Sequence, residues 1–544
     1  MPTDCRYSGK PVRVKVGKAM GEGTAFSFLL HMKSQSFIKG AIIIAAGGIA
    51  AKILGAFYRI PLTNILGGEG MGIYQMVYPL YCLLLTVSAT GIPSGLARLV
   101  SAAEAKGDRE KSRAVLRKSL LLFSAIGFAG SALMFLLAPL MSMAQKEISA
   151  ISAYRALAPG VFLVSVLSCF RGWFQGKSNF LPTALSEICE QAVKVAVGVF
   201  VANLYRSDVV RAVTATLFAV TLSELAACIL MLFLAGKERG VRPLYRERIP
   251  ILRSKMLLRI TIPVTVAAGV LPLSNIADSI LIVRMIGAYA DNATALYGLY
   301  SGAAATLVNL PVSVCYGIAA AIIPAVSALA SKGSVKEAEN RILFALKCTL
   351  YLSMPAALFL FVFSGRITSF LFASVTGAEG EILSKLVRSL SFAAVLLSVV
   401  QTLSAGLTGC GKPRIAAFSM TAAVAIKLLA EAVLLRYPQI SVLGAAYASI
   451  GCYFVAILVN LLYSIRERKN RWAFFGLAGK FLLMSAAAVL PAAAVARVHV
   501  LLSLAVAAAV YLALSVLLRA FTAEELQIAW RKKNGNRCRV RVRS

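Results

Sequence analysis

The sequence predicts an all-α integral membrane protein with about fourteen transmembrane helices, arranged as two pseudo-symmetric six-helix bundles plus two C-terminal helices. Its 544 residues are 59% hydrophobic and only 15% charged, whereas soluble domains average about 25% charged residues. A transmembrane helix needs roughly 20 apolar residues. Three stretches of about that length contain no charged residue: 119–138, 348–365 and 500–518. A sequence motif that recurs in the second half of the chain predicts the two bundles.

Hydropathy along the chain gives the individual helices. Several are longer than a bilayer requires and must therefore tilt, bend or protrude. In chain order, the predicted helices cover 37–60, 71–99, 116–141, 151–172, 180–204, 212–236, 257–286, 295–330, 343–372, 384–408, 414–435, 441–465, 477–496 and 499–519.

These helices divide the chain into six parts. Residues 1–35 form a basic extension that is expected to be disordered, because they lack the apolar run of a secretory signal. The first six helices make an N-lobe and the next six a C-lobe. The predicted boundaries after the extension are 36–236 for the N-lobe, 237–256 for a basic cytoplasmic linker, 257–466 for the C-lobe, 467–520 for the last two helices and 521–544 for a basic cytoplasmic tail.

The formal charge of +34 comes from 57 Lys and Arg against 23 Asp and Glu. Such an excess is typical of proteins that meet nucleic acid, an anionic membrane surface or an anionic substrate. Here the basic residues form short clusters between apolar helices, which favours anionic lipid at the cytoplasmic face. No soluble domain remains to bind nucleic acid. The clusters occupy alternate loops, so the positive-inside rule places those loops and both termini in the cytoplasm.

An internal repeat relates the two lobes. Val100-Ser101-Ala102, followed by Lys106-Gly107, recurs as Val326-Ser327-Ala328, followed by Lys332-Gly333, at a spacing of 226 residues. A looser similarity pairs residues 174–177 with 409–412. The repeat predicts two bundles with the same orientation, related by an axis along the membrane normal. Transporters of this plan bind their substrate between the halves.

Charged residues inside the predicted helices are candidates for function, because each costs about 2.5–3.5 kcal/mol to insert. Lys52 and Arg59 lie seven residues apart on one helical face and have no acid at helical spacing. Together with Arg284 they are the candidate substrate-binding cations of a cavity. Cations without local partners favour an anionic substrate, and a diphosphate matches the bidentate fork of arginine.

A second set of polar residues has candidate roles in coupling or in lining the cavity. Asn275 and Asp278 lie beside a prolyl break and offer oxygen ligands to a cation or proton. The alternative for Asp278 is simple pairing with a Lys or Arg of another helix. Glu224 and Glu431 are the other coupling candidates. The simpler alternative is that Glu190–Lys194 and Lys427–Glu431 are i,i+4 pairs that neutralise each other. The candidate polar residues of the cavity are Glu187, Glu190, Gln191, Lys194 and Lys427.

Several classes of activity are excluded by missing motifs. The sequence contains no Walker loop of the GxxxxGK[ST] form, so the protein is not expected to be an ATPase or another enzyme. Its two histidines and ten cysteines show no metal-ligand spacing, and no cofactor is expected. Transport energy would then come from a Na⁺ or H⁺ gradient or from the membrane potential.

Several runs resemble a known family: 36–40 (SFIKG), 52–62 (KILGAFYRIPL), 67–75 (GGEGMGIYQ) and 170–176 (FRGWFQG), with Pro182-Thr183-Ala184 and Glu190-Gln191. They resemble the stage V sporulation protein B family of polysaccharide transporters. That family belongs to the MOP superfamily, together with MurJ lipid II flippases and MATE exporters. The resemblance covers residues 34–520 and implies a MATE/MurJ-like fold in a bacterial plasma membrane.

The resemblance also implies a function. By it, the protein would flip an undecaprenyl-diphosphate-linked saccharide, a lipid II-like peptidoglycan precursor for the spore cortex, by alternating access alongside the peptidoglycan synthesis machinery. One departure concerns the eighth helix, where MurJ flippases carry an arginine shortly before a proline. The matching stretch 300–311 has no basic residue, and Thr306 and Asn309 stand there instead.

Two other functions remain open from the sequence. A MATE-like, ion-coupled exporter of small cationic molecules would need acids to dominate its cavity, and Glu190, Glu224, Asp278 and Glu431 supply candidates. A membrane scaffold for a synthetic complex has local support only from the basic tail 531–543, which is better explained by contact with anionic lipid.

Overall fold

The computed structural model describes residues 37–238, 269–465, 468–495 and 499–522. The described residues form helices and turns, and no strand occurs among them. The expected N-terminal extension, most of the linker, most of the tail and the first part of the seventh helix lie outside the described residues.

The N-lobe contains six α-helical elements. They are α2 (Phe37–Leu85), α3 (Ile92–Glu104), α4 (Arg109–Ala144), α5 (Ala150–Gly176), α6 (Leu181–Leu204) and α7 (Val209–Lys237). A short π-helix, η1 (Thr86–Thr90), joins α2 to α3.

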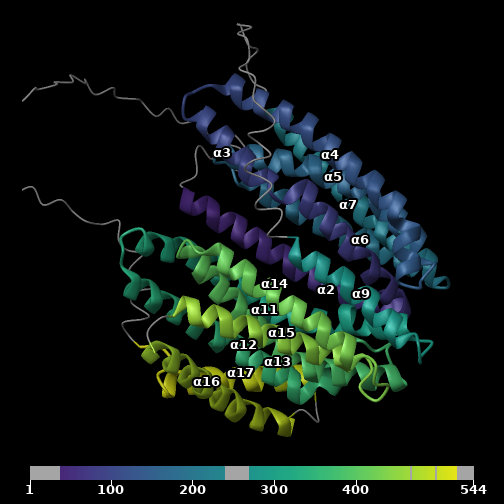
Figure 1. The fold of residues 1–544 in the computed structure, drawn as a ribbon, viewed down its shortest axis with the longest axis vertical. Helices are drawn as coiled ribbons and strands as arrows, with labels where there is room; N and C mark the ends of the chain where they lie inside the picture. The colour runs from purple at the N-terminus through teal and green to yellow at the C-terminus, as the bar shows by residue number, and fades with distance from the viewer. Residues whose placement is uncertain (1–36, 239–268, 466–467, 496–498, 523–544) are drawn as a thin grey trace, which may run out of the picture.

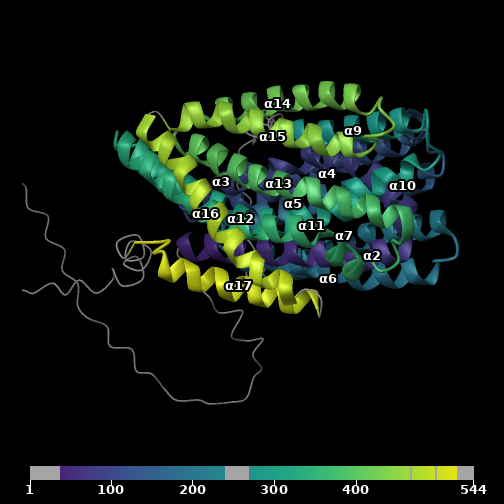
Figure 2. The same cartoon turned by 90° about the horizontal axis from the view of Figure 1, so that it is seen from below.

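The C-lobe repeats this order and is followed by two more helices. It contains α9 (Val270–Ile286), α10 (Ala293–Tyr297), α11 (Ala305–Ala330), α12 (Val335–Leu371), α13 (Gly377–Gly409), α14 (Pro413–Leu434) and α15 (Leu443–Ser464), with the π-helix η2 (Gly298–Ala304) between α10 and α11. The last two helices are α16 (Arg468–Val495) and α17 (Val500–Leu517). They pack against α12 of the C-lobe, where the Tyr511 hydroxyl donates to the Tyr351 carbonyl at 2.9 Å (Figure 2).

The protein is a multi-pass membrane protein. Eleven helices in the described part of the chain are long and apolar enough to cross a bilayer. Three features account for the difference from the expected fourteen. α2 contains two predicted spans, α6 carries three charged residues, and the described part of α9 has only 17 residues.

α2 is two helical segments joined at Gly67. This glycine has φ 68° and ψ −171°, a conformation that side-chain-bearing residues rarely adopt. A straight helix would hold Tyr58 and Tyr74 about 24 Å apart, at 1.5 Å per residue, yet both line one cavity. The chain therefore folds back at Gly67, which brings both segments to the same site.

The expected repeat is confirmed. α10 begins at Ala293 and α11 ends at Ala330, which are 226 residues after Gly67 and Glu104 at the corresponding points of the N-lobe. The turns that follow α3 and α11 contain Gly107 (φ 72°) and Gly333 (φ 75°), so they share one left-handed conformation.

The looser similarity between residues 174–177 and 409–412 is misaligned by two residues. A Cβ added to Gly176 would lie 2.6 Å from the Cβ of Val100, and a Cβ added to Gly409 would lie 2.9 Å from the Cβ of Val326. Val100 and Val326 are repeat counterparts, so Gly176 corresponds to Gly409 rather than to Gly411. The spacing between the repeats thus rises to 233 residues in this region, because α13 is longer than α5.

The two lobes meet at the end away from the basic loops and separate toward the end where α3 ends (Figure 1). Gln75 Nε2 donates to the Ser301 carbonyl at 3.0 Å, and Gln145 Nε2 donates to Ser279 Oγ at 2.9 Å. Asn64 Nδ2 donates to the Leu371 carbonyl at 2.7 Å. These hydrogen bonds close one end of the space between the lobes.

Candidate functional site

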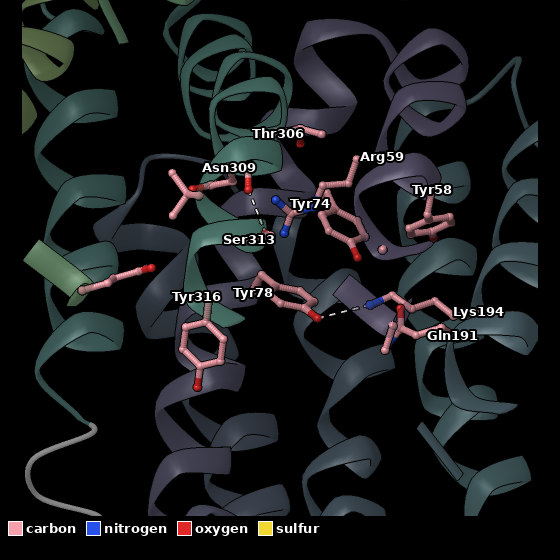
Figure 3. Close-up of a pocket in the computed structure, with 14 residues that line it drawn as sticks. Tyr58, Arg59, Tyr74, Tyr78, Gln191, Lys194, Thr306, Asn309, Ser313 and Tyr316 are labelled. Atoms are coloured by element: carbon pink, nitrogen blue, oxygen red, sulfur yellow. Dashed lines mark hydrogen bonds between the residues drawn. The ribbon is translucent and has the colours of Figure 1, made fainter. Parts of the chain in front are cut away.

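A cavity of about 430 Å³ lies between the lobes (Figure 3). Both segments of α2 contribute to it, together with α6, α11 and α13. Its lining residues are Ala51, Gly55, Tyr58, Arg59, Tyr74, Tyr78, Gln191, Lys194, Thr306, Asn309, Val312, Ser313, Tyr316 and Gln401. Two of these residues are basic and none is acidic.

Lys194 of α6 is one of the two cavity cations. Its ammonium donates to the Tyr78 hydroxyl at 3.3 Å and lies 5.8 Å from the ring centroid of Tyr58 (Figure 3). Aromatic faces attract cations, so this lysine is held by tyrosines. It forms no ion pair with a carboxylate of the described residues.

Arg59 is the second cavity cation. It comes from the first segment of α2, and its side chain points into the cavity beside Tyr74 (Figure 3). Arg59 forms no ion pair within the part of the chain that the structure describes. Two cations in a cavity without acids produce a positive potential that favours an anionic ligand.

Tyrosines cover the N-lobe wall of the cavity. The rings of Tyr74 and Tyr78 are stacked with centroids 5.6 Å apart. Tyr58 packs over Gly198, where an added Cβ would lie 2.5 Å from the tyrosine hydroxyl. The sequence analysis did not identify these rings as cavity residues; the available signal was two tyrosines four residues apart in an apolar helix.

Neutral polar residues form the C-lobe wall. Thr306, Asn309 and Ser313 of α11 face the cavity, and Ser313 Oγ donates to the Asn309 carbonyl at 2.8 Å (Figure 3). Gln401 of α13 joins them, and its buried Oε1 has no hydrogen-bond partner among the described residues. Thr306 and Asn309 therefore stand in the cavity, at the positions where the sequence resemblance expected an arginine.

The structure does not bring all three predicted substrate cations together. Arg284 is exposed and donates to the Ala144 carbonyl at 2.5 Å, at the end where the lobes meet. Lys52 lies in α2, but its side chain is outside the described residues. Arg59 alone of the three is placed in the cavity.

The predicted Glu190–Lys194 pair is wrong. Glu190 Oε2 instead accepts from Arg171 Nη2 at 3.0 Å, across from α6 to α5. Arginine and lysine both form charge-assisted hydrogen bonds with a carboxylate. Here the arginine of α5 is the partner of Glu190, and Lys194 contacts the tyrosines instead. Gln191 lines the cavity beside Lys194.

The remaining N-lobe acids lie outside the cavity lining. Glu224 is buried, and its Oε1 accepts from the Tyr81 hydroxyl at 3.4 Å, while its Oε2 has no partner among the described residues. Glu187 is half-buried with one unpartnered oxygen.

A buried ionic triad lies inside the C-lobe. Lys427 of α14 pairs with Asp278 of α9, and its Nζ lies 3.4 Å from Glu431 Oε1. The side chains of Lys427, Asp278 and Glu431 are 10%, 7% and 0% exposed. The predicted Lys427–Glu431 pair is confirmed, and Asp278 joins it. Asn275, on the same helix as Asp278, is exposed.

The two buried lysines are repeat counterparts. Lys427 follows Lys194 by 233 residues, the same spacing that relates Gly409 to Gly176. The acid at Glu431 has Gly198 as its N-lobe counterpart, and Tyr58 occupies the space above that glycine. One lysine of the pair therefore faces the cavity, and the other is neutralised inside its own lobe.

The described residues contain no cluster of three or more His, Cys, Asp or Glu side chains that could hold a metal ion.

A family model for polysaccharide biosynthesis proteins matches residues 37–330, which is more than half of the chain. The chain belongs to this family. Among curated relatives, stage V sporulation protein B of Bacillus subtilis is 25% identical to this chain, over 80% of the chain and 85% of the relative. Lipid II flippase MurJ of the same organism is 24% identical, over 79% and 82%.

Solved structures share the fold of this chain. A MurJ lipid II flippase in an inward closed conformation matches with a TM-score of 0.67 at 15% identity, over 88% of this chain and 99% of that one. An inward-facing multidrug MATE transporter of the MOP superfamily matches with a TM-score of 0.64 at 17% identity, over 80% and 98%. The expected family resemblance and the MATE/MurJ-like fold are confirmed.

Proposed function

We propose that this protein is a flippase for an undecaprenyl-diphosphate-linked saccharide, a lipid II-like peptidoglycan precursor for the spore cortex. It moves the headgroup from the inner to the outer leaflet. The observation that carries the proposal is the cavity between the lobes, which is lined by Arg59, Lys194 and neutral polar groups without an acid. The names of two relatives, a lipid II flippase and a stage V sporulation protein, support the same function.

The cavity residues fit the parts of such a headgroup. The guanidinium of Arg59 can hold phosphate oxygens in bidentate fashion, and Lys194 acts as a second point charge. The tyrosine faces and the amide and hydroxyl groups of α11 suit a sugar ring. The cavity volume of about 430 Å³ is within the usual range of ligand sites. The lipid tail of the substrate would stay in the bilayer.

Alternating access follows from the arrangement of the lobes. The hydrogen bonds around Gln75, Gln145 and Asn64 close the end away from the basic loops. We place the basic loops and both termini on the cytoplasmic side of a bacterial plasma membrane. With that orientation, the arrangement is an inward-facing state. Transport requires these contacts to break while the lobes approach each other at the opposite end. Anionic lipid at the cytoplasmic face and the peptidoglycan synthesis machinery are the proposed partners.

The proposed coupling site is the C-lobe triad. Two carboxylates face one ammonium, which leaves one negative charge in a buried place. Asp278 Oδ1 and both oxygens of Glu431 lack hydrogen-bond partners among the described residues. A buried, uncompensated charge is costly, so uptake of H⁺ or Na⁺ at this site is favourable and can link an ion gradient to lobe movement.

The MATE-like alternative is not favoured by the geometry. A cavity for cationic molecules would place its acids on the lining, but Glu190, Glu224, Asp278 and Glu431 lie outside it. The similarity to MATE structures concerns the fold, at 17% identity or less.

Proteoliposomes test the proposal directly. Purified protein should move a labelled undecaprenyl-diphosphate disaccharide-pentapeptide between leaflets, and Arg59→Ala should reduce the rate at least tenfold. Arg155→Ala is the matched control, because Arg155 is an exposed arginine of α5 that contacts the Phe135 ring outside the cavity. Equal translocation rates in liposomes with and without the protein would contradict the proposed function. Equal rates for wild type and Arg59→Ala would contradict the assigned site.

A further inference from the structure

A second pocket lies at the basic end of the N-lobe, away from the cavity between the lobes. It has a volume of about 320 Å³ and is bounded by the ends of α3, α4, α5 and α7. Its charged side chains are four basic and two acidic, which leaves an excess of two positive charges. The residues that line it are Glu104, Arg109, Ser112, Arg113, Trp173, Lys177, Lys237 and Glu238.

The floor of this pocket is fixed by packing. Trp173 is 4% exposed, and its Nε1 donates to Ser112 Oγ at 3.2 Å. A Cβ added to Gly172 would lie 2.8 Å from the Cα of Pro93, so α5 lies close against α3. Lys177 lies over the Trp173 ring, with 4.4 Å from Nζ to the centroid, and forms an ion pair with Glu238.

The cations of the pocket crowd one another. Burial lowers the pKa of Lys177 from its ordinary value, and the neighbouring Arg109 and Arg113 lower it further, against the opposing effect of Glu104. Neither arginine forms an ion pair with a described residue. A bound anion would relieve this repulsion and gain charge-assisted hydrogen bonds.

The fold alone does not produce this pocket, because the equivalent corner of the C-lobe lacks its chemistry. At the spacing of 226 residues, Arg109 corresponds to Val335 and Arg113 to Glu339. At the spacing of 233 residues, Trp173 corresponds to Gly406 and Lys177 to Cys410. The arginine pair, the indole and the lysine that stacks on it are thus present in one lobe only.

We propose that this pocket binds the phosphate of an anionic phospholipid headgroup. The pocket lies where helices end in basic loops, at the level where lipid headgroups meet the protein. Arg109 and Arg113 are placed to hold the phosphate oxygens, and the Ser112 hydroxyl, which accepts from Trp173, keeps its own proton to donate. The indole and the lysine form the wall on which the glycerol portion rests. This site is independent of the identity of the transported substrate.

Lipid binding to the purified full-length protein tests the proposal by native mass spectrometry, with short-chain phosphatidylglycerol as the probe. Arg109→Gln/Arg113→Gln should raise the Kd for phosphatidylglycerol by about tenfold or more, because each basic residue near the headgroups contributes on the order of 1 kcal/mol. The control, Arg117→Gln/Lys118→Gln, removes the same charge from the next turns of α4 outside the pocket and should change the Kd less than twofold. The thermal unfolding midpoints of both double variants without lipid should match that of the wild type, which verifies that the variants fold.

Two further probes identify the source of the phosphate. Phosphatidylcholine should bind much more weakly, and inorganic phosphate should compete only weakly. Equal losses of affinity for phosphatidylglycerol in both double variants would contradict binding in the pocket, since they would indicate diffuse attraction of the lipid to the basic loops. Equal affinity for phosphatidylcholine would overturn the anion selectivity, and inorganic phosphate that binds as tightly as the lipid would overturn the lipid assignment.

Discussion

Gly72 and Gly298 hold equivalent positions in the two repeats, 226 residues apart, and lie against each other where the lobes meet. A Cβ added to Gly298 would lie 2.4 Å from the backbone nitrogen of Gly72. Gln75 and Ser301, at the same spacing of 226 residues, are joined by a hydrogen bond. In a two-fold arrangement, a residue near the axis meets its own counterpart. The pseudo-two-fold axis therefore passes through this contact, which places the closed end of the cavity on the axis.

Gly72→Ala should open this end. The added Cβ would lie 2.1 Å from the Thr294 carbonyl oxygen, a backbone atom that no side-chain rotation can move away. Overpacking of this kind costs about 1–3 kcal/mol, enough to shift the balance between the two access states. Spin labels at Lys146 and Ala288, in a cysteine-free background, should report a longer distance between the lobes. Gly451→Ala, where an added Cβ meets nothing within 4 Å, is the control; an unchanged distance in Gly72→Ala would contradict the closing role.

Lys194→Met should weaken binding of an anionic headgroup. The change removes one of the two cations of the cavity but keeps an apolar stem of similar length. A hydrogen bond to a charged group contributes about 1.5–3 kcal/mol, so the Kd of a water-soluble sugar diphosphate should rise about tenfold or more. Lys194→Arg should retain most of the affinity. Lys385→Met removes a lysine that is 60% exposed and should leave the Kd unchanged; a Kd that does not respond to Lys194→Met would remove this lysine from the site.

Lys427→Met should destabilise the protein. It leaves Asp278 and Glu431 buried without their shared ammonium, and breaking a buried pair costs about 3–5 kcal/mol. Thermal unfolding in detergent should show a clearly lower midpoint. Adding Asp278→Asn to Lys427→Met removes one of the stranded charges and should recover part of the loss. If the double variant were less stable than Lys427→Met alone, Lys427 would not stabilise the two carboxylates as described here.

Glu431→Gln should separate transport from the ion gradient. It keeps the shape of the side chain and removes the acid that is expected to take up the coupling ion. Transport without a gradient should continue, and stimulation by an imposed pH or Na⁺ gradient should disappear; the gradient that stimulates wild type identifies the ion. Glu381→Gln, on an exposed glutamate at the start of α13, is the control. Stimulation that survives in Glu431→Gln would place coupling elsewhere.

Much of the fold follows from the sequence, because apolar runs and a repeated motif are local signals. Composition was sufficient for an all-α membrane protein, and the Val-Ser-Ala motif located the two lobes. The repeat register after α13 could not be read in this way. The sequence similarity pairs Gly176 with Gly411, whereas the longer α13 raises the spacing from 226 to 233 residues and makes Gly409 the counterpart. That shift is visible only in the packing of each glycine on its valine.

The candidate site was only partly predictable. Arg59 was identified from its isolation from acids, and Lys427–Glu431 from helical spacing. Helical spacing could not show that Glu190 pairs with Arg171 of α5 rather than with Lys194, because spacing within one helix does not predict contacts between helices. The fold-back at Gly67 brings Tyr74 and Tyr78 beside Arg59, and this placement also depends on tertiary structure.

The most direct test of the central claim is a cargo comparison in proteoliposomes that contain the wild-type protein. One arm follows a labelled undecaprenyl-diphosphate saccharide, and the other follows a cationic dye under imposed H⁺ and Na⁺ gradients. Because the cavity is lined by Arg59 and Lys194 without an acid, the lipid-linked diphosphate should be translocated and the dye should not. Transport of the dye without movement of the lipid-linked saccharide would contradict the account.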